Sequence, residues 1–178
     1  MKKIQKWSFL GLGVVILFGA VFFVTSKKPS QAGIAVSPEV GYRLPSFTLT
    51  TYPRNGSINV TPNIHKPMFI NFWASWCPPC QAEAPGLEKA YKKYGQQVEF
   101  VGVNLTMQDS LSAVQNFLSK YGVTYTTALD KTGMVASEYK VVAIPTSIFV
   151  NRSGVIVDRY TGAIPAQYLD SDLQRIQQ

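Results

Sequence analysis

The sequence predicts an α/β domain with a mixed β-sheet, preceded by a membrane-spanning segment. Three observations carry this prediction. Strand patterns alternate with helical patterns after residue 45, a strand–turn–strand pattern over 147–162 closes the domain, and a long apolar run lies near the N-terminus. Alternating strands and helices are typical of an α/β sheet, and a closing hairpin adds antiparallel strands to it.

The N-terminal apolar run, 7–24, is predicted to be a transmembrane helix. Its 18 residues carry no charge, and as a helix they would span about 27 Å, close to the hydrocarbon thickness of a bilayer. The alternative is a cleaved signal peptide, whose apolar region is usually shorter. Its candidate cleavage sites, 30–32 and 33–35, lie well beyond the run. The length of the run, and Lys27 and Lys28 after it, favour an uncleaved signal-anchor.

The distribution of charge points to a membrane rather than to nucleic acid. The 178 residues have a formal net charge of +7, but five of the seventeen basic residues flank the apolar run, and the remaining chain is almost balanced. Basic residues near a membrane helix are retained preferentially in the cytoplasm. We therefore expect residues 1–6 to be cytoplasmic, the body of the chain to lie outside, and no nucleic acid to be a partner. The five basic residues are Lys2, Lys3, Lys6, Lys27 and Lys28.

The rest of the chain divides into a tether, 25–44, and a globular domain, 45–178. The tether is rich in Pro, Ser, Gly and Ala and lacks periodicity. In the domain, apolar runs between turn residues predict strands, and apolar residues on one helical face predict helices. Strands are predicted over 46–52, 57–60, 67–73, 98–105, 125–129 and within 147–162, and helices over 83–95, 109–122, 134–139 and from about 165, with Asp109 or Ser110 as the cap of the second helix.

The two cysteines, Cys77 and Cys80, are the strongest functional signal. A closed zinc site needs about four nitrogen or sulfur ligands, and His65 is the only histidine in the sequence. A purely structural disulfide across two residues would remove little chain entropy. Redox cycling between dithiol and disulfide is therefore the favoured interpretation, and neither a metal nor another cofactor is expected.

The spacing of the pair assigns a role to each sulfur. If a helix starts near Pro78, the Cys77 sulfur lies at the positive end of the helix dipole, which stabilises the thiolate and lowers its pKa. Cys80 lies one turn further along and is positioned to attack a mixed disulfide on Cys77. We therefore expect Cys77 to be the nucleophile and Cys80 the resolving thiol. Pro78 and Pro79 lack N–H groups and remove two donors from the thiolate.

The residues around the cysteines resemble a known family. A Trp-Cys-x-x-Cys sequence after a buried strand, within NFWASWCPPC (71–80), is similar to the signature of the thioredoxin fold. The finer resemblance is to the ResA/TlpA-like membrane-anchored thiol–disulfide oxidoreductases, and it covers about residues 40–177. The other motifs that carry it are Pro45-x-Phe47, Glu83, Pro85 and VVAIPTSIFVNRSGVIVDRYTG (141–162).

The resemblance implies a thioredoxin-like fold with a mixed central sheet flanked by helices, an N-terminal β-hairpin and an internal strand–helix insertion, supplied by 104–130. It also implies a cis peptide bond before Pro145, which would bring the backbone of Ile144 opposite Cys77. We interpret Trp76 as a surface aromatic that shapes a substrate groove. The residues assigned to substrate binding are Trp76, Pro78, Pro79, Ile144, Pro145 and Thr146.

A proton-transfer role for Glu83 also follows from the resemblance. Glu83 is three residues after Cys80, about one helical turn away, and the family pattern implies that it accepts the proton of the buried thiol. Desolvation would raise its pKa and suit it to that role. The alternative is an ordinary solvated helix glutamate. Thioredoxin has a buried aspartate near the position of Asn71, and its absence here favours Glu83 as the replacement.

The expected function is that of an extracytoplasmic, single-pass membrane protein that reduces protein disulfides through Cys77 and Cys80. The family implies electron supply by an integral membrane donor of the CcdA or DsbD type. It also implies substrates such as apocytochrome c or cell-wall and spore-envelope proteins, and we expect a monomer. One alternative is a DsbA-like oxidant that introduces disulfides. Another is a non-enzymatic haem-handling or chaperone module that retains the fold.

Overall fold

The computed structural model describes residues 33–178, of which Ile34–Gln178 form one compact unit. The predicted cytoplasmic end (1–6), the transmembrane segment (7–24) and the first part of the tether (25–32) lie outside the described residues. Within 33–178, no helix is both long enough and apolar enough to cross a membrane.

The compact unit is built on a seven-stranded mixed sheet with the strand order β2-β1-β5-β4-β3-β6-β7. The three strands β3, β4 and β5 run parallel to one another, and every other neighbouring pair is antiparallel. The predicted mixed sheet and its two hairpins are thus present. The strands are β1 (Phe47–Tyr52), β2 (Ser57–Val60), β3 (Met68–Trp73), β4 (Glu99–Asn104), β5 (Thr126–Leu129), β6 (Thr146–Val150) and β7 (Ile156–Thr161).

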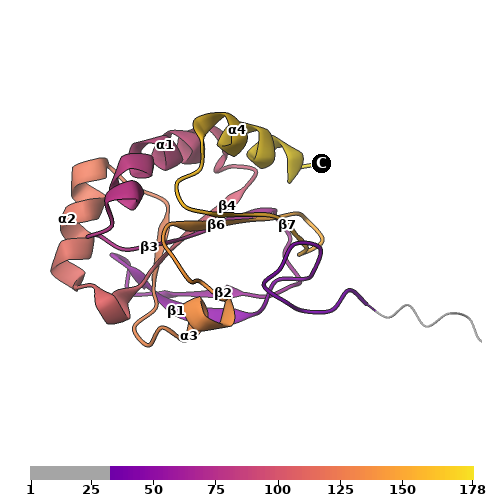
Figure 1. Cartoon of the computed structure of the whole chain (residues 1–178), viewed down its shortest axis with the longest axis horizontal. Coiled ribbons are helices and arrows are strands. Elements are labelled where there is room, and N and C mark those ends of the chain that lie inside the picture. Colours follow the sequence, from indigo (N-terminus) through magenta and orange to yellow (C-terminus); the bar gives the residue numbers. More distant parts are fainter. Residues whose placement is uncertain (1–32) are drawn as a thin grey trace, which may run out of the picture. The chain divides into compact units, whose positions relative to one another are not determined.

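The helices cover both faces of the sheet, with α1 and α4 on one face and the short α3 on the other (Figure 1). The helix α2 packs beside α1 and, together with β5, forms the predicted strand–helix insertion. Its N-cap is Ser110, whose side chain accepts a hydrogen bond from the Ala113 N–H. The helices within residues 33–178 are α1 (Pro78–Tyr94), α2 (Leu111–Tyr121), α3 (Met134–Glu138) and α4 (Ala166–Arg175), and a 3-10 turn, η1, lies at Thr106–Gln108.

The apolar core follows from the alternation of side chains along buried strands. All six residues of β3 are buried, and successive residues serve opposite faces of the sheet. Phe69 packs under α1 and α4, whereas Ile70 and Phe72 pack on the α3 side against Tyr139 and its neighbours. Because β3 is covered on both faces, neither of its faces needs polar side chains for contact with water, and its sequence is apolar except for the buried Asn71.

Residues 34–44 belong to the compact unit, which corrects the predicted end of the tether. Leu44 is fully buried. The Gly41 N–H donates to the Ile156 carbonyl and the Ile156 N–H donates to the Tyr42 carbonyl, each at 2.8 Å. This segment therefore covers the start of the edge strand β7 and satisfies the outward-facing N–H and carbonyl groups of Ile156. The partner strand is more than a hundred residues away, so no local pattern indicated this pairing.

Candidate active site

The two cysteines lie where β3 passes into α1. Cys77 is the N-cap of α1, with extended backbone angles, and Pro78 and Pro79 occupy the first two helical positions. The first free helical N–H is therefore that of Cys80, which donates to the Cys77 sulfur at 3.2 Å. Cys77 and Cys80 form a disulfide with a Cα–Cα distance of 5.3 Å. The predicted placement of the Cys77 sulfur at the helix N-terminus is confirmed.

Burial does not distinguish the two cysteines in this disulfide form. Each is 2% exposed, so whole-residue exposure does not show which sulfur a substrate reaches first. Position distinguishes them instead, because the Cys77 sulfur receives the Cys80 N–H and also lies 3.7 Å from the carbonyl oxygen of Ile144. The assignment of Cys77 as the nucleophile stays a prediction that this geometry supports.

The loop before β6 lies opposite the cysteines. The Ile144–Pro145 peptide bond is cis, as expected from the resemblance. The Thr146 hydroxyl donates to the Ala143 carbonyl at 2.7 Å, and the Gly162 N–H donates to the Pro145 carbonyl at 2.7 Å. Thr146 is fully buried, so it holds the loop in shape rather than lining its surface.

A groove of about 330 Å³ opens beside Cys77. Its apolar lining is well exposed, since Val142 is 89% and Trp76 53% accessible. The Trp76 indole N–H donates to the Gln108 carbonyl at 2.9 Å, which fixes the ring as one wall. Pro78 and Pro79 are exposed at the adjoining start of α1 but do not line this groove. The full lining is Trp76, Leu105, Gln108, Val141, Val142, Ala143 and Ile144.

Glu83 lies on the sheet-facing side of α1, over the centre of the sheet. One carboxylate oxygen accepts a hydrogen bond from the Asn71 side-chain amide at 2.9 Å, and the other accepts from the Ile164 N–H at 3.4 Å. Burial raises the pKa of Glu83 to about 7, although the bonds from Asn71 and Ile164 partly oppose the rise. The carboxylate is thus poised to gain or lose a proton near neutral pH.

Ser147 belongs to the surroundings of Glu83, although the sequence alone does not single it out. The Asn71 amide donates to the Ser147 hydroxyl at 2.9 Å as well as to Glu83. Asn71 and Ser147 are direct partners in the pairing of β3 with β6. A serine after a loop proline carries no local signal of such a contact, because only the strand register brings the two residues together.

The described residues include no group of three or more His, Cys, Asp or Glu side chains that could hold a metal ion. The site offers a pair of cysteines two residues apart, one of them capping a helix, and a partly buried carboxylic acid whose pKa is raised to about 7. The Ile144 carbonyl of the cis-proline loop lies 3.7 Å from the sulfur of Cys77, and both Ile144 and Trp76 line the neighbouring groove. This combination suits exchange between a dithiol and a disulfide.

Comparison with known proteins agrees with this chemistry. The redoxin family matches residues 39–176. The chain is 39% identical to the thiol–disulfide oxidoreductase ResA of Bacillus subtilis, over 92% of this chain and 89% of the relative. It is 30% identical to the protein of the same name from Bacillus cereus, over 99% of each chain.

A solved structure shares both the fold and part of the sequence. A secreted disulfide oxidoreductase of Mycobacterium tuberculosis, homologous to Escherichia coli DsbE, superposes with a TM-score of 0.63 and 30% identity. The match covers 72% of this chain and 95% of the other. The chain therefore belongs to the redoxin family, and with its Cys77–Cys80 pair it is a thiol–disulfide oxidoreductase of the ResA and DsbE type.

Proposed function

We propose that this oxidoreductase works as a reductant of protein disulfides outside the cytoplasmic membrane. One observation carries the direction of electron flow. Because Pro78 and Pro79 occupy the first two helical positions, Cys80 supplies the first helical N–H that reaches the Cys77 sulfur. A thiol pair becomes a strong oxidant when its reduced form is strongly stabilised. With two donors missing, the Cys77 thiolate is stabilised less, and the pair gives up electrons more readily.

Each turnover moves two electrons from the enzyme to a substrate disulfide. The Cys77 thiolate attacks one substrate sulfur, forming a mixed disulfide and releasing the other sulfur as a thiolate. The Cys80 thiol then passes its proton to the Glu83 carboxylate and attacks the Cys77 sulfur. This step forms the Cys77–Cys80 disulfide and expels the second substrate sulfur as a thiolate, which takes up the proton held by Glu83. A thiol donor afterwards returns two electrons and one proton, which restore the Cys77 thiolate and the Cys80 thiol.

The proposed location rests on the apolar run 7–24 and the basic residues that flank it. An uncleaved helix there would place the catalytic domain outside the membrane. That side is oxidising, so a reductant must receive its electrons through the membrane, from an integral donor of the CcdA or DsbD type. Suitable substrates are apocytochrome c before haem attachment and disulfide-bonded proteins of the cell envelope or spore.

The direction is tested by the reduction potential of the Cys77–Cys80 pair. Equilibration of the full-length chain with dithiothreitol buffers should give a value near thioredoxin's, about −270 mV. A value near that of DsbA, about −120 mV, would overturn the proposal and assign the chain to oxidation instead.

The substrates are identified by trapping. Cys80→Ser leaves the mixed disulfide on Cys77 without its resolving thiol, so substrates should remain covalently attached and be identifiable by mass spectrometry. The Cys77→Ser/Cys80→Ser double variant is the matched control, because it keeps the fold and lacks the nucleophile. If the cysteine-free chain still supports the cellular role, a non-enzymatic haem-handling or chaperone function replaces the proposal.

The membrane anchor has its own test. The mature protein should sediment with membranes, and its catalytic domain should be accessible to protease added from outside. A freely soluble mature protein that begins near Gly33 or Val36 would contradict the anchor and favour a cleaved signal peptide.

A further inference from the structure

Asp109 makes more hydrogen bonds than its place in a surface connection requires. It follows the 3-10 turn η1 and precedes Ser110, and Ser110 rather than Asp109 caps α2. The Asp109 side chain turns back toward the cysteine loop instead. One carboxylate oxygen accepts from the Ser75 hydroxyl at 2.6 Å and the Ser110 N–H at 2.9 Å, and the other accepts from the Ser75 N–H at 2.7 Å and the Asn104 amide at 2.9 Å.

Ser75 is the second residue of the turn that delivers the nucleophile. The turn runs from Ala74 to Cys77 and is closed by the Cys77 N–H, which donates to the Ala74 carbonyl at 3.3 Å. Asp109 bonds both the backbone N–H and the hydroxyl of Ser75. The neighbouring Gln108 carbonyl accepts from the Trp76 indole N–H at 2.9 Å. Residues 108–109 therefore hold both residues that directly precede Cys77.

The remaining polar group of Ser75 is also tied to the insertion. The Gln81 side-chain amide on α1 donates to the Ser75 carbonyl at 2.8 Å, and the Tyr121 hydroxyl on α2 donates to Gln81 at 3.3 Å. The N–H, the hydroxyl and the carbonyl of Ser75 all have partners. Of these partners, Asp109 alone holds two groups at once, and its bonds carry a formal charge.

Asp109 is an anion at neutral pH. Burial raises its pKa, but the hydrogen bonds from the Ser75 side chain and backbone, Asn104 and Ser110 together outweigh burial and hold the pKa below its usual range. Asp109 can affect the pKa of Cys77 in two opposite ways, through its own charge and through the position in which it holds the turn. A negative charge close to the loop disfavours the Cys77 thiolate, whereas a fixed turn keeps the sulfur under the Cys80 N–H and favours the thiolate.

We propose that Asp109 is a positioning residue for the nucleophile. By clamping Ser75, it keeps the Cys77 sulfur at the N-terminus of α1 and the Trp76 ring against the groove. This inference concerns thiol–disulfide exchange itself and is independent of the direction of electron flow. It therefore stands or falls separately from the reductase assignment.

The test compares Asp109→Ala and Asp109→Asn in the full-length chain. Alanine leaves the donors of Ser75 and Asn104 without an acceptor and loosens the turn. Asparagine loses the charge but keeps one acceptor oxygen. The pKa of Cys77 is read from the pH dependence of iodoacetamide alkylation of the reduced protein, with the Cys77 peptide quantified by mass spectrometry. Turnover is read as kcat and KM for insulin disulfides with dithiothreitol as donor.

The expected results separate position from charge. Asp109→Ala should raise the pKa of Cys77 by about one, which lowers its alkylation rate about tenfold below that pKa, and should raise KM through the loosened Trp76. In Asp109→Asn, which keeps one acceptor oxygen but has no charge, the pKa of Cys77 should equal the wild-type value or lie below it. If the pKa of Cys77 falls equally in both variants, only the charge of Asp109 affects the thiolate. If the pKa of Cys77 is unchanged in Asp109→Ala, the hydrogen bonds of Asp109 do not position the sulfur. Either result overturns the proposal.

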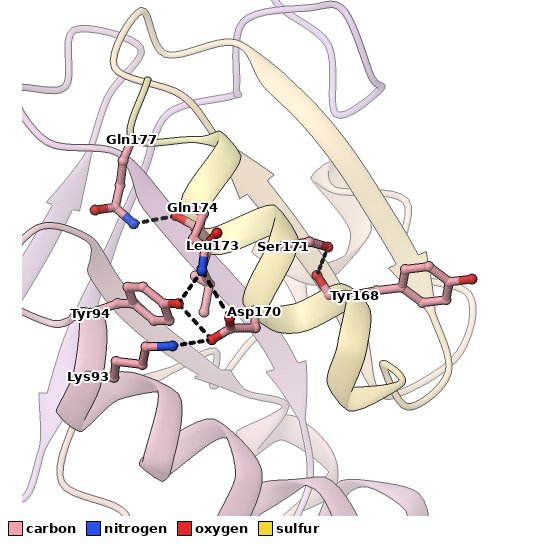
Figure 2. A network of polar contacts seen from close by, with 8 residues as sticks. All are labelled: Lys93, Tyr94, Tyr168, Asp170, Ser171, Leu173, Gln174 and Gln177. Atoms are coloured by element: carbon pink, nitrogen blue, oxygen red, sulfur yellow. Dashed lines mark hydrogen bonds and ion pairs between the residues drawn. The ribbon is translucent and has the colours of Figure 1, made fainter.

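Two further variants keep the test valid if Asp109→Ala folds poorly. Ser75→Ala removes only the hydroxyl bond and should shift the pKa of Cys77 in the same direction by a smaller factor. Asp170→Ala is the matched control, because Asp170 also accepts bonds at both carboxylate oxygens but lies beside the other end of α1 (Figure 2). It should leave the pKa of Cys77 and KM unchanged. A shift there equal to that of Asp109→Ala would contradict a local clamp.

Discussion

The carboxylates at the two ends of α1 have pKa values shifted in opposite directions. Near the N-terminal end, Glu83 is partly buried and accepts hydrogen bonds only from neutral donors, the amide of Asn71 and the backbone of Ile164, and burial raises its pKa to about 7. At the C-terminal end, the Asp170 side chain is 48% exposed and accepts from Lys93 at 2.8 Å and Tyr94 at 2.6 Å (Figure 2). The hydrogen bond from Lys93, followed by that from Tyr94, lowers the pKa of Asp170.

This contrast shows that the surroundings of a carboxylate decide whether it can transfer protons or only stabilise the fold. A carboxylate without a cation and out of water changes its protonation state near neutral pH, which proton transfer during thiol exchange requires. A carboxylate bonded to an ammonium and a phenol stays ionised and holds two helices together. The same helix thus carries reactive groups at one end and its connection to α4 at the other.

Replacing the nucleophile has the largest expected effect. Cys77→Ser should reduce turnover of insulin disulfides to the uncatalysed background, because serine neither ionises near neutral pH nor forms a disulfide. The reduced wild-type chain and Cys80→Ser should both still form a mixed disulfide with a labelled peptide. Mixed-disulfide formation by Cys77→Ser at the wild-type rate would identify Cys80 as the attacking thiol instead.

Glu83→Gln is expected to change the pH dependence of stability. Because the pKa of Glu83 rises from 4.5 to about 7 on folding, protonation favours the folded state, and the benefit is complete below pH 4.5 and lost as the pH rises through 7. Relative to the glutamine variant, the wild type should lose up to about 3 kcal/mol of unfolding free energy between pH 4.5 and pH 8. Urea denaturation of both oxidised chains at the two pH values measures the difference.

The glutamine variant also tests the proton-transfer role. If Glu83 takes the Cys80 proton, Glu83→Gln should change the pH profile of the resolving step, followed as release of a trapped substrate peptide. A parallel loss of unfolding free energy at every pH, together with an unaltered pH profile, would contradict a buried, titrating Glu83.

At the C-terminal end of α1, the expected effects are smaller and confined to stability. Tyr94→Phe removes the hydroxyl that donates to Asp170 and accepts from Gln174. Since Tyr94 is largely buried, the loss should be about 1 kcal/mol of unfolding free energy. Turnover should stay at the wild-type level, and a clear drop in turnover would show that the two ends of α1 are coupled.

The smallest expected effect is that of Lys93→Gln. Its ion pair with Asp170 is exposed on both sides, and such pairs contribute little because water and salt screen them. The unfolding midpoint should fall only slightly at low ionic strength, and the difference should vanish at high salt. A difference that persists in 1 M NaCl would mean that the lysine acts through packing over Tyr94.

Much of the fold was predictable because it depends on local patterns. The apolar sequence of β3, the cap of α2 and the closing hairpin are each specified by neighbouring residues, and all are present. The cysteine spacing likewise indicates a redox pair, because a two-residue gap between thiols is itself a local feature. The extent of the tether was predicted wrongly, because the pairing of residues 41–42 with Ile156 joins distant parts of the chain.

The sequence by itself was enough to indicate thiol–disulfide chemistry, and it predicts that the Cys77 sulfur reacts first. A cysteine at a helix start and a second one turn later have consequences that hold in any fold. In contrast, the surroundings of Glu83 and of the cysteine loop depend on contacts between distant parts of the chain. The register of β3 with β6 brings Asn71 and Ser147 together beneath Glu83, and the connection after β4 brings Asp109 to Ser75. The physical reason is that pKa values and loop positions depend on burial and on partners from distant segments, which no short stretch of sequence contains.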